Sequence, residues 1–351
     1  MAFRMTRLSD LAEAGFDTVI DVRSPSEFAE DRVPGAISLP VLTDEERARV
    51  GTIYVKENPF LARKIGAALV ARNAAAHIEG PLAGKDGGWR PLVYCWRGGQ
   101  RSGSFATILA QIGWRVETLE GGYQSYRRLV VKRLYDDPVP SRVVLLDGNT
   151  GTAKTDILNA LRDEGVQVID LEGLAKHRGS ALGGQGQQPS QKGFESALAA
   201  VIDALDPARP VVVEAESSRI GRVNLPPRLF AAMKDAPRIE IAASVDARAE
   251  YLTRAYADLV LDRDALEERL DRLVKLQGRE VVENWKALGV AGRHRELAEE
   301  LIREHYDPRY RKVRERIGGE EVVTLETDRL GPEDVRRLAG EIAGRLNGPS
   351  G

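Results

Sequence analysis

The chain has 351 residues, of which 42% are hydrophobic and 30% charged, and its formal net charge is −2. These values predict an ordinary folded protein of about two domains and do not mark it as a general nucleic-acid binder, although a local basic face is compatible with them. The single cysteine excludes an internal disulfide and a cysteine-based zinc site. No apolar run approaches the roughly 18 residues that span a bilayer, and the first residues carry no signal-peptide pattern. We therefore expect a cytoplasmic protein without a membrane segment.

The first part of the chain alternates strand and helix signals. Residues 18–22 are β-rich, and Ser24 followed by Pro25 marks a helix start, because a capping hydroxyl precedes a proline at the first helical position. The further elements that we expect are a turn and short strand at 33–40, a helix within 57–76, a strand at 91–94, a helix at 103–111 and a strand at 116–119. This alternation predicts a parallel sheet, in which reactive groups lie at the carboxyl ends of the strands.

Cys95 stands directly after an expected strand and opens a loop with two glycines and two arginines. Backbone N–H groups at Gly98 and Gly99, the charge of Arg101 and the N-terminus of the following helix would all favour an anion here, and Arg97 belongs to the same anion-binding loop. Such surroundings lower the pKa of a thiol and predict a catalytic thiolate. The competing interpretation is a small buried residue at a strand end, because free cysteines are commonly buried.

A polar, proline-containing segment at 136–140 predicts a boundary between a first domain at 1–137 and a second domain at 138–347. A strand-like run at 142–147 then leads into a glycine-containing loop and a helix. The loop consists of Gly148, Asn149, Thr150, Gly151, Thr152, Ala153, Lys154 and Thr155. This order is nearly that of a P-loop, whose backbone N–H groups surround a diphosphate, whose lysine pairs with it and whose last hydroxyl could hold magnesium.

Ala153 departs from the P-loop pattern, which has glycine before the lysine. If this position needs a positive φ angle, alanine costs about 1–2 kcal/mol there. If φ is negative, the methyl group only narrows the loop. An ordinary surface loop is the competing interpretation of the whole segment.

Three further residues are candidates for a second site beside this loop. Glu214 and Glu216 end an apolar strand-like run; they could orient a magnesium-bound water, or they are simply polar residues at a strand end. Arg178 lies in the glycine- and glutamine-rich segment 177–189 and is its best candidate for an anion contact. The sequence establishes no metal site.

Residues 246–317 form a helix-rich, highly charged segment of the second domain. Interleaved arginines and glutamates are typical of solvent-exposed helices joined by ion pairs, but aromatic residues among the arginines also suit unstacked RNA bases, so we expect RNA contact. A strand and a helix within 320–346 close the domain. The predicted fold class is α/β, with a parallel-sheet domain followed by a P-loop domain that carries a charged helical insertion.

The first domain resembles rhodanese domains in the order of its short motifs. These motifs are residues 21–28, 33–37, 95–102 and 121–123. The resemblance implies a rhodanese-like fold and a cysteine that carries sulfur or selenium. The arginine of the cysteine loop follows the cysteine by six positions instead of the five usual in rhodaneses, and six is also the interval in cysteine-dependent phosphatases. A phosphatase is thus a further alternative, although no clear acid residue accompanies the loop.

Joined to the P-loop domain, this first domain makes nearly the whole chain resemble the tRNA 2-selenouridine synthase family. The runs that carry the resemblance are Asp21–Pro25, Cys95–Gly99, Gly148–Gly151, His177–Ser180 and Glu214–Ser217. It implies an enzyme that acts on 2-thiouridine at the wobble position of certain tRNAs. The implied co-substrates are geranyl diphosphate, which geranylates the base sulfur, and selenophosphate, whose selenium then replaces the geranylthio group. The sequence does not indicate the oligomeric state.

In the mechanism that the resemblance implies, Lys154 and Thr155 bind the diphosphate while the base sulfur attacks C1, and Cys95 then receives or presents selenium to C2 of the base. Two other functional classes of protein remain compatible with the sequence. One is a rhodanese sulfurtransferase fused to a nucleotide-hydrolysing P-loop module, which tRNA-stimulated hydrolysis would favour. The other is a non-catalytic RNA-binding protein, in which Cys95 reacts with iodoacetamide no faster than a free thiol at about pH 6–7.

Overall fold

The structure, a computed structural model, describes residues 2–179, 187–314 and 322–347. Its two larger sheets have five strands each, and every strand pair in them is parallel. The predicted α/β class with parallel sheets is thereby confirmed. None of the helices within these ranges is long and apolar enough to cross a membrane.

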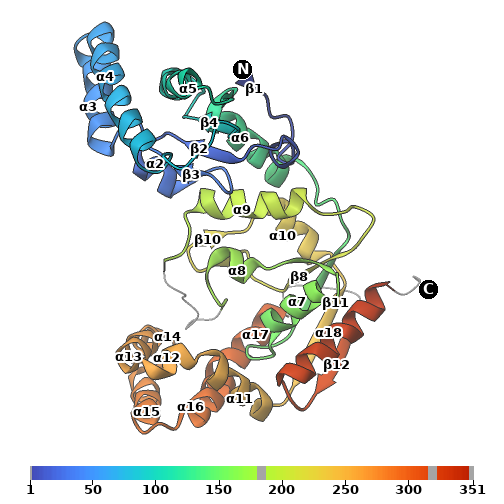
Figure 1. Cartoon of the computed structure of the whole chain (residues 1–351). Helices are drawn as coiled ribbons and strands as arrows, with labels where there is room; N and C mark the ends of the chain where they lie inside the picture. Colours follow the sequence, from blue (N-terminus) through green and yellow to red (C-terminus); the bar gives the residue numbers. More distant parts are fainter. Residues whose placement is uncertain (1, 180–186, 315–321, 348–351) are drawn as a thin grey trace. The chain divides into compact units, whose positions relative to one another are not determined.

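The chain divides into two compact units (Figure 1). Unit 1 contains residues 1–137 together with 189–204, and unit 2 contains 138–188 together with 205–351. The sequence alone assigns 189–204 to the second domain, whereas in the structure this segment packs with unit 1.

Unit 1 is built on a sheet of the order β1-β5-β4-β2-β3. Its strands are β1 (Ala2–Phe3), β2 (Thr18–Asp21), β3 (Ile37–Ser38), β4 (Pro91–Tyr94) and β5 (Glu117–Leu119). Its helices are α1 (Asp10–Glu13), α2 (Pro25–Glu30), α3 (Asp44–Lys56), α4 (Pro59–Glu79), α5 (Gln100–Ile112), α6 (Gly122–Val131), the π-helix η1 (Lys132–Asp136) and α9 (Gln191–Asp203). Strand β4 is the central strand, so the loop that follows it emerges at the middle of the sheet.

The first turn of α2 follows from its sequence. Ser24 is the N-cap, Pro25 occupies the first helical position, and the backbone N–H of Ser24 donates to Glu27 at 3.1 Å. Between β3 and β4 the chain forms a hairpin of α3 and α4, of which the sequence indicates only the second helix.

Helix α9 completes the core of unit 1 although it comes later in the chain than β7. Its buried residues include Phe194, Leu198 and Ile202. The hydroxyl of Ser196 donates to the carboxylate of Asp31 at 2.9 Å, and both residues are buried. Losing a partner of a buried carboxylate is costly, so this contact ties the helix to unit 1 specifically.

Unit 2 is built on a sheet of the order β12-β11-β6-β8-β7. Its strands are β6 (Val143–Asp147), β7 (Gln167–Ile169), β8 (Val211–Glu214), β11 (Arg238–Ala243) and β12 (Val322–Thr327), with β9 (Arg219–Ile220) and β10 (Val223–Asn224) as a separate antiparallel pair. The helices beside them are α7 (Lys154–Asp163), α8 (Leu171–Ala175), α10 (Pro227–Lys234) and α18 (Pro332–Asn347). Strand β6 lies between β8 and β11, so the loops after these three strands meet at one edge.

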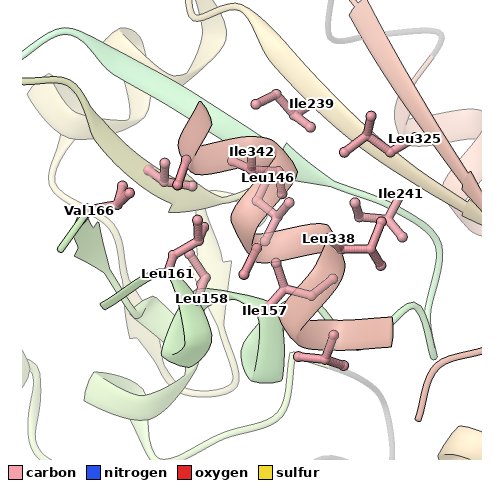
Figure 2. Packing of buried hydrophobic residues seen from close by; sticks show 14 of the residues in the cluster. Leu146, Ile157, Leu158, Leu161, Val166, Ile239, Ile241, Leu325, Leu338 and Ile342 are labelled. Atoms are coloured by element: carbon pink, nitrogen blue, oxygen red, sulfur yellow. The ribbon is translucent and has the colours of Figure 1, made fainter. Parts of the chain in front are cut away.

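A hydrophobic core joins α7 and α18 to the sheet of unit 2 (Figure 2). Leu146 of β6, Ile157 and Leu161 of α7 and Leu338 of α18 are each fully buried. Burial of one such side chain contributes roughly 1.5–3 kcal/mol. Because α7 begins at Lys154, this packing also fixes where the loop between β6 and α7 ends.

The charged segment of unit 2 is helical, as its pattern predicts. Its helices are α11 (Val245–Ala255), α12 (Ala257–Leu261), α13 (Arg263–Asp271), α14 (Val274–Gln277), α15 (Arg279–Val290), α16 (His294–Glu300), the π-helix η2 (Leu301–Tyr306) and α17 (Asp307–Arg314). They have a core of their own around the fully buried Trp285, with Leu266 and Leu270. Exposed pairs such as Arg263–Glu267 cover the outside, and each contributes at most about 0.5 kcal/mol.

Candidate functional sites

Cys95 directly follows β4, at the carboxyl end of the central strand of unit 1. The hydroxyl of Ser102, in the first turn of α5, donates to its sulfur at 3.2 Å, and the backbone N–H groups of Ser102 and Gly99 also bond to it. The cysteine itself is buried, with 3% of its surface exposed, whereas Arg97 in the same loop is exposed. The loop therefore surrounds a buried sulfur with hydrogen-bond donors.

The electrostatic surroundings favour the thiolate form of this sulfur. Burial by itself would raise the pKa of the Cys95 thiol, but the donors from Ser102 and the nearby charge of Arg101 outweigh it, so the pKa lies below its usual value. Arg101 is held in place by Glu27, whose carboxylate accepts from the arginine Nη1 at 2.9 Å. The carboxylate in the first turn of α2 thus also orients the cation beside the cysteine.

Two glycines allow the cysteine loop to lie against the loop after β5. Gly98 and Gly122 have φ angles of 67° and 58°. A Cβ atom on Gly98 would lie 2.7 Å from the carbonyl oxygen of Leu119, and one on Gly122 would overlap the carbonyl oxygen of Cys95. The N–H of Tyr123 donates to that Cys95 carbonyl at 2.8 Å. The close approach of these loops therefore fixes the backbone of the cysteine.

We expect Gly122→Ala to destabilise unit 1 by about 3 kcal/mol or more, because the new methyl group would overlap backbone atoms at a φ angle that L side chains disfavour. Gly99→Ala is the matched control, since a Cβ there meets no atom within 4 Å and its φ is −99°. Urea unfolding of the two variants measures the difference. Equal stability of both proteins would contradict the packing of these loops.

In unit 2 the chain runs from β6 through the loop 148–153 into α7, the strand–loop–helix order of a P-loop. Ala153 has φ 59° and ψ 27°, so this position is left-handed and alanine bears the cost of about 1–2 kcal/mol. No side chain caps the N-terminus of α7 within the described ranges, which leaves its first N–H groups open to an anion. The ammonium group of Lys154 donates to the carbonyl oxygen of Gly148 at 2.7 Å.

The charged helices hold this loop from the side. Arg248 of α11, which is buried, donates through Nε to the carbonyl oxygen of Thr150 at 2.9 Å and through its two Nη atoms to Asp307 at 3.0 and 2.6 Å. Asp307 also accepts from the side-chain amide of Asn149 at 3.1 Å. A bidentate arginine pair fixes orientation as well as distance, so Arg248 positions the loop and is not exposed to RNA.

Three glutamates gather beside the loop. The hydroxyl of Thr155 donates to Glu172 at 3.1 Å, and the backbone N–H of Glu172 donates to Glu214 at 2.5 Å. Glu172 and Glu216 share a hydrogen bond between their carboxyl groups. Burial raises the pKa of all three carboxyls, and the charge of Glu172 raises those of the other two further, to about 8 for Glu216. At neutral pH the group therefore retains protons.

The raised pKa of Glu216 makes stability depend on pH. In the folded protein Glu216 keeps its proton up to about pH 8, whereas a glutamate in the unfolded chain releases it near pH 4.3. The stability that protonated Glu216 contributes to the folded state is therefore complete below about pH 4 and is lost as the pH rises to 8. We expect Glu216→Gln, which cannot ionise, to gain on the order of 2 kcal/mol relative to wild type between about pH 5 and pH 9. Chemical denaturation at several pH values measures this difference. The exposed Glu164→Gln is the control, and a similar trend in both variants would contradict the assignment to Glu216.

A cavity of about 640 Å³ lies over the P-loop. Its lining includes Thr150 to Thr155, Glu172 and Glu216, and Arg178, whose guanidinium stacks 4.6 Å from the ring centre of Tyr256. Apolar and aromatic side chains complete the lining: Phe230, Met233, Tyr251, Leu252, Tyr256, Tyr306 and Tyr310. The cavity therefore combines anion-binding groups with an apolar surface.

The donors around Thr155 do not form a ready metal centre. In the part of the chain that the structure describes, no three histidine, cysteine, aspartate or glutamate side chains are placed to hold a metal ion. The carboxyl of Glu214 is fully buried, and one of its oxygens has no hydrogen-bond partner, as expected of a neutral acid.

The structure brings to the P-loop three residues that sequence reasoning did not single out as site residues: Glu172, Arg248 and Asp307. Glu172 lies just after β7, as Glu214 lies at the end of β8, so an acidic residue following an apolar strand was the available signal. Asp307 lies among many charged helical residues, and no local pattern distinguishes it. Residues 180–186 of the loop after Arg178 lie outside the described ranges.

Comparison with known proteins adds family relationships to this geometry. Residues 141–269 match the tRNA 2-selenouridine synthase AAA domain family, and residues 5–129 match the Rhodanese-like domain family. The chain is 31% identical over 331 residues to the tRNA 2-selenouridine synthase of Psychromonas ingrahamii, covering 94% of this chain and 82% of that protein. It is 38% identical over 267 residues to the tRNA 2-selenouridine synthase of Aeromonas salmonicida, covering 74% and 70%. Among solved structures, the chain matches the N-terminal domain of a protein from Clostridium difficile 630 that is described as ATP/GTP binding. The two sequences are 31% identical, the match covers 37% of this chain and 99% of that domain, and the TM-score is 0.32.

Proposed function

Because the chain belongs to the tRNA 2-selenouridine synthase family, we propose that it is a transferase that converts 2-thiouridine at the wobble position of tRNA into 2-selenouridine. Geranyl diphosphate first geranylates the sulfur, and selenium from selenophosphate then replaces the geranylthio group. The observation that supports this best is the cavity of unit 2, which joins a P-loop to apolar and aromatic side chains. Geranyl diphosphate has an anionic head and an apolar tail and needs both kinds of surface.

In the first step the diphosphate binds at the N-terminus of α7. Lys154 exchanges its contact with the carbonyl of Gly148 for the diphosphate oxygens. The base sulfur bonds to C1 of the geranyl group, the C1–O bond breaks, and diphosphate leaves with the bonding electrons. Lys154 and the N–H groups of the loop stabilise the charge that develops on this leaving group.

In the second step Cys95 is the nucleophile that releases selenium. Its thiolate bonds to the phosphorus of selenophosphate, the Se–P bond breaks, and selenide leaves with the bonding electrons. Selenide bonds to C2 of the base while geranylthiolate leaves, and water then hydrolyses the S–P bond to restore the thiolate and give phosphate. The lowered pKa of Cys95, the donors around it and its six-position spacing from Arg101 all favour a phosphoryl group at this loop.

Nucleoside mass spectrometry of thiolated tRNA tests the proposal. With the protein and geranyl diphosphate alone, we expect 2-geranylthiouridine to appear. Addition of selenophosphate should convert it into 2-selenouridine. If the folded protein forms neither nucleoside, the proposed function is wrong. Such a reaction belongs in the cytoplasm, where tRNA and reduced thiols coexist.

A nucleotide-hydrolysing P-loop module is the competing function, and it predicts ATP or GTP hydrolysis that tRNA stimulates. We expect no such hydrolysis. Burial raises the pKa of both carboxyls beside the P-loop, Glu214 and Glu216. At about 8 for Glu216, this pKa makes Glu216 poorly suited to orient an attacking water at neutral pH.

A further inference from the structure

The hairpin of α3 and α4 lies between β3 and β4 in the chain, and none of its residues lines the cavity of unit 2 (Figure 1). Its root is fixed to unit 1, because the side-chain amide of Asn73 donates to the carbonyl oxygen of Val41 at 2.9 Å and His77 contacts that of Pro40 at 2.9 Å. The hairpin tip, defined here as residues 49–66, extends away from the sheet of unit 1. We propose that the hairpin tip binds tRNA through its backbone phosphates and unstacked bases.

Large apolar side chains are exposed at the hairpin tip. Tyr54 is 55% exposed, Val55 82%, Phe60 69% and Leu61 40%. The seam between the two helices is filled by other side chains, including the buried Ile53, so the exposed four do not hold the hairpin together. Clustered exposed aromatic and aliphatic groups are typical of an interaction site.

The turn between the helices holds this surface in a defined shape. The side chain of Asn58 accepts from the N–H groups of Phe60 at 2.8 Å and Leu61 at 3.0 Å, and Pro59 occupies the first position of α4. Phe60 and Leu61 therefore lie in the capped first turn of a helix and not in a flexible loop. A surface that is already ordered loses less conformational entropy on binding.

The hairpin tip is basic although the whole chain is slightly acidic. It contains Arg49, Lys56, Arg63 and Lys64 against the single Glu57, which gives a net charge of +3. All four basic residues are exposed, and within the described ranges none of them forms an ion pair. A positive surface of this kind favours a polyanion.

The combination of charge and aromatic side chains selects RNA among the partners that could cover this surface. Tyrosine and phenylalanine stack on unpaired bases, and lysine and arginine bind the phosphates between them. A dimer formed through two hairpin tips would bring two surfaces of net charge +3 together, and their repulsion disfavours such a contact. The proposed function supplies the RNA, because a tRNA anticodon loop offers unstacked bases near the wobble position, and the inference rests on that function for the identity of the RNA.

Fluorescence anisotropy tests this inference by measuring the affinity of the full-length protein for a tRNA transcript at several salt concentrations. Tyr54→Ser combined with Phe60→Ser should weaken binding about tenfold or more, which corresponds to about 1.4 kcal/mol of lost stacking. Arg63→Glu combined with Lys64→Glu should weaken binding as well and reduce the slope of log affinity against log salt by about 1.5, because two phosphate contacts are lost. Both pairs are exposed, so thermal unfolding should be unchanged.

Arg72→Glu combined with Lys85→Glu is the matched control, because both residues are exposed in unit 1, lie outside the hairpin tip and give the same net charge. We expect this control to bind tRNA within about threefold of wild type. An equal loss in the control, or unchanged affinity in both tip variants, would overturn the inference. So would a dimer that the aromatic substitutions dissociate without any change in tRNA affinity.

The same experiment separates this inference from the proposed function. If wild-type protein does not bind tRNA and forms no modified nucleoside, both fail together. If wild type forms 2-selenouridine and the tip variants bind tRNA as well as it does, only the hairpin assignment fails.

Discussion

Cys95→Ala should lower the rate of 2-selenouridine formation at least about a thousand-fold while geranylation of the tRNA continues near the wild-type rate. The sulfur is the nucleophile only of the selenium step, whereas the diphosphate step uses the P-loop of unit 2. The substitution removes one sulfur from the core of unit 1, which costs roughly 1–2 kcal/mol, so the protein should remain folded. Nucleoside mass spectrometry with geranyl diphosphate alone and with both co-substrates measures the two steps separately.

Cys95→Ser is the closest control for shape, because its hydroxyl fits the same space but does not ionise near neutral pH. It should be as deficient in selenium transfer as the alanine variant. If a folded variant lost both reactions equally, the division of the two steps between Cys95 and the P-loop would be wrong.

Lys154→Ala should weaken the binding of geranyl diphosphate about 10- to 100-fold in calorimetry. The variant loses one charge-assisted hydrogen-bond donor at the mouth of the P-loop, and such a donor contributes roughly 1.5–3 kcal/mol. Inorganic diphosphate should lose affinity by a similar factor, since the interaction involves only the anionic head. Conversion of tRNA that already carries 2-geranylthiouridine should proceed normally.

Lys275→Ala is the control for this variant, because Lys275 is an exposed lysine of unit 2 that does not line the cavity. Its affinity for geranyl diphosphate should equal that of wild type. Unchanged affinity in Lys154→Ala would remove the P-loop from diphosphate binding.

The parts of the fold that follow from contiguous sequence could be predicted. The strand before Cys95 and the helix after it, the loop between β6 and α7, and the start of α2 at Pro25 all depend on residues next to one another in the chain. In each case periodicity, glycine and capping residues act over a few positions, which a sequence displays directly. The same holds for the charged helices, whose arginine and glutamate spacing is local.

The remainder depends on contacts between distant residues. The φ angle of Ala153 is set by packing around the loop, so the sequence could state only the two alternatives and their cost. The link from Asp307 to Asn149 joins residues 158 positions apart, and no local signal announces it. The pKa values of Glu214 and Glu216 are raised by their burial in the folded protein and by the approach of Glu172 in space. The same limitation explains why 189–204 could not be assigned to unit 1 from sequence.

The placement of α9 determines which fragments of the chain contain a complete core. A fragment that stops at Asp137 would omit the helix that buries Phe194 and would leave the Asp31 carboxylate without the hydroxyl of Ser196. The complementary fragment would carry that helix with no core to cover its apolar face. A rhodanese-like fragment that keeps the whole core of unit 1 therefore needs residues 189–204 joined after position 137 through a new linker.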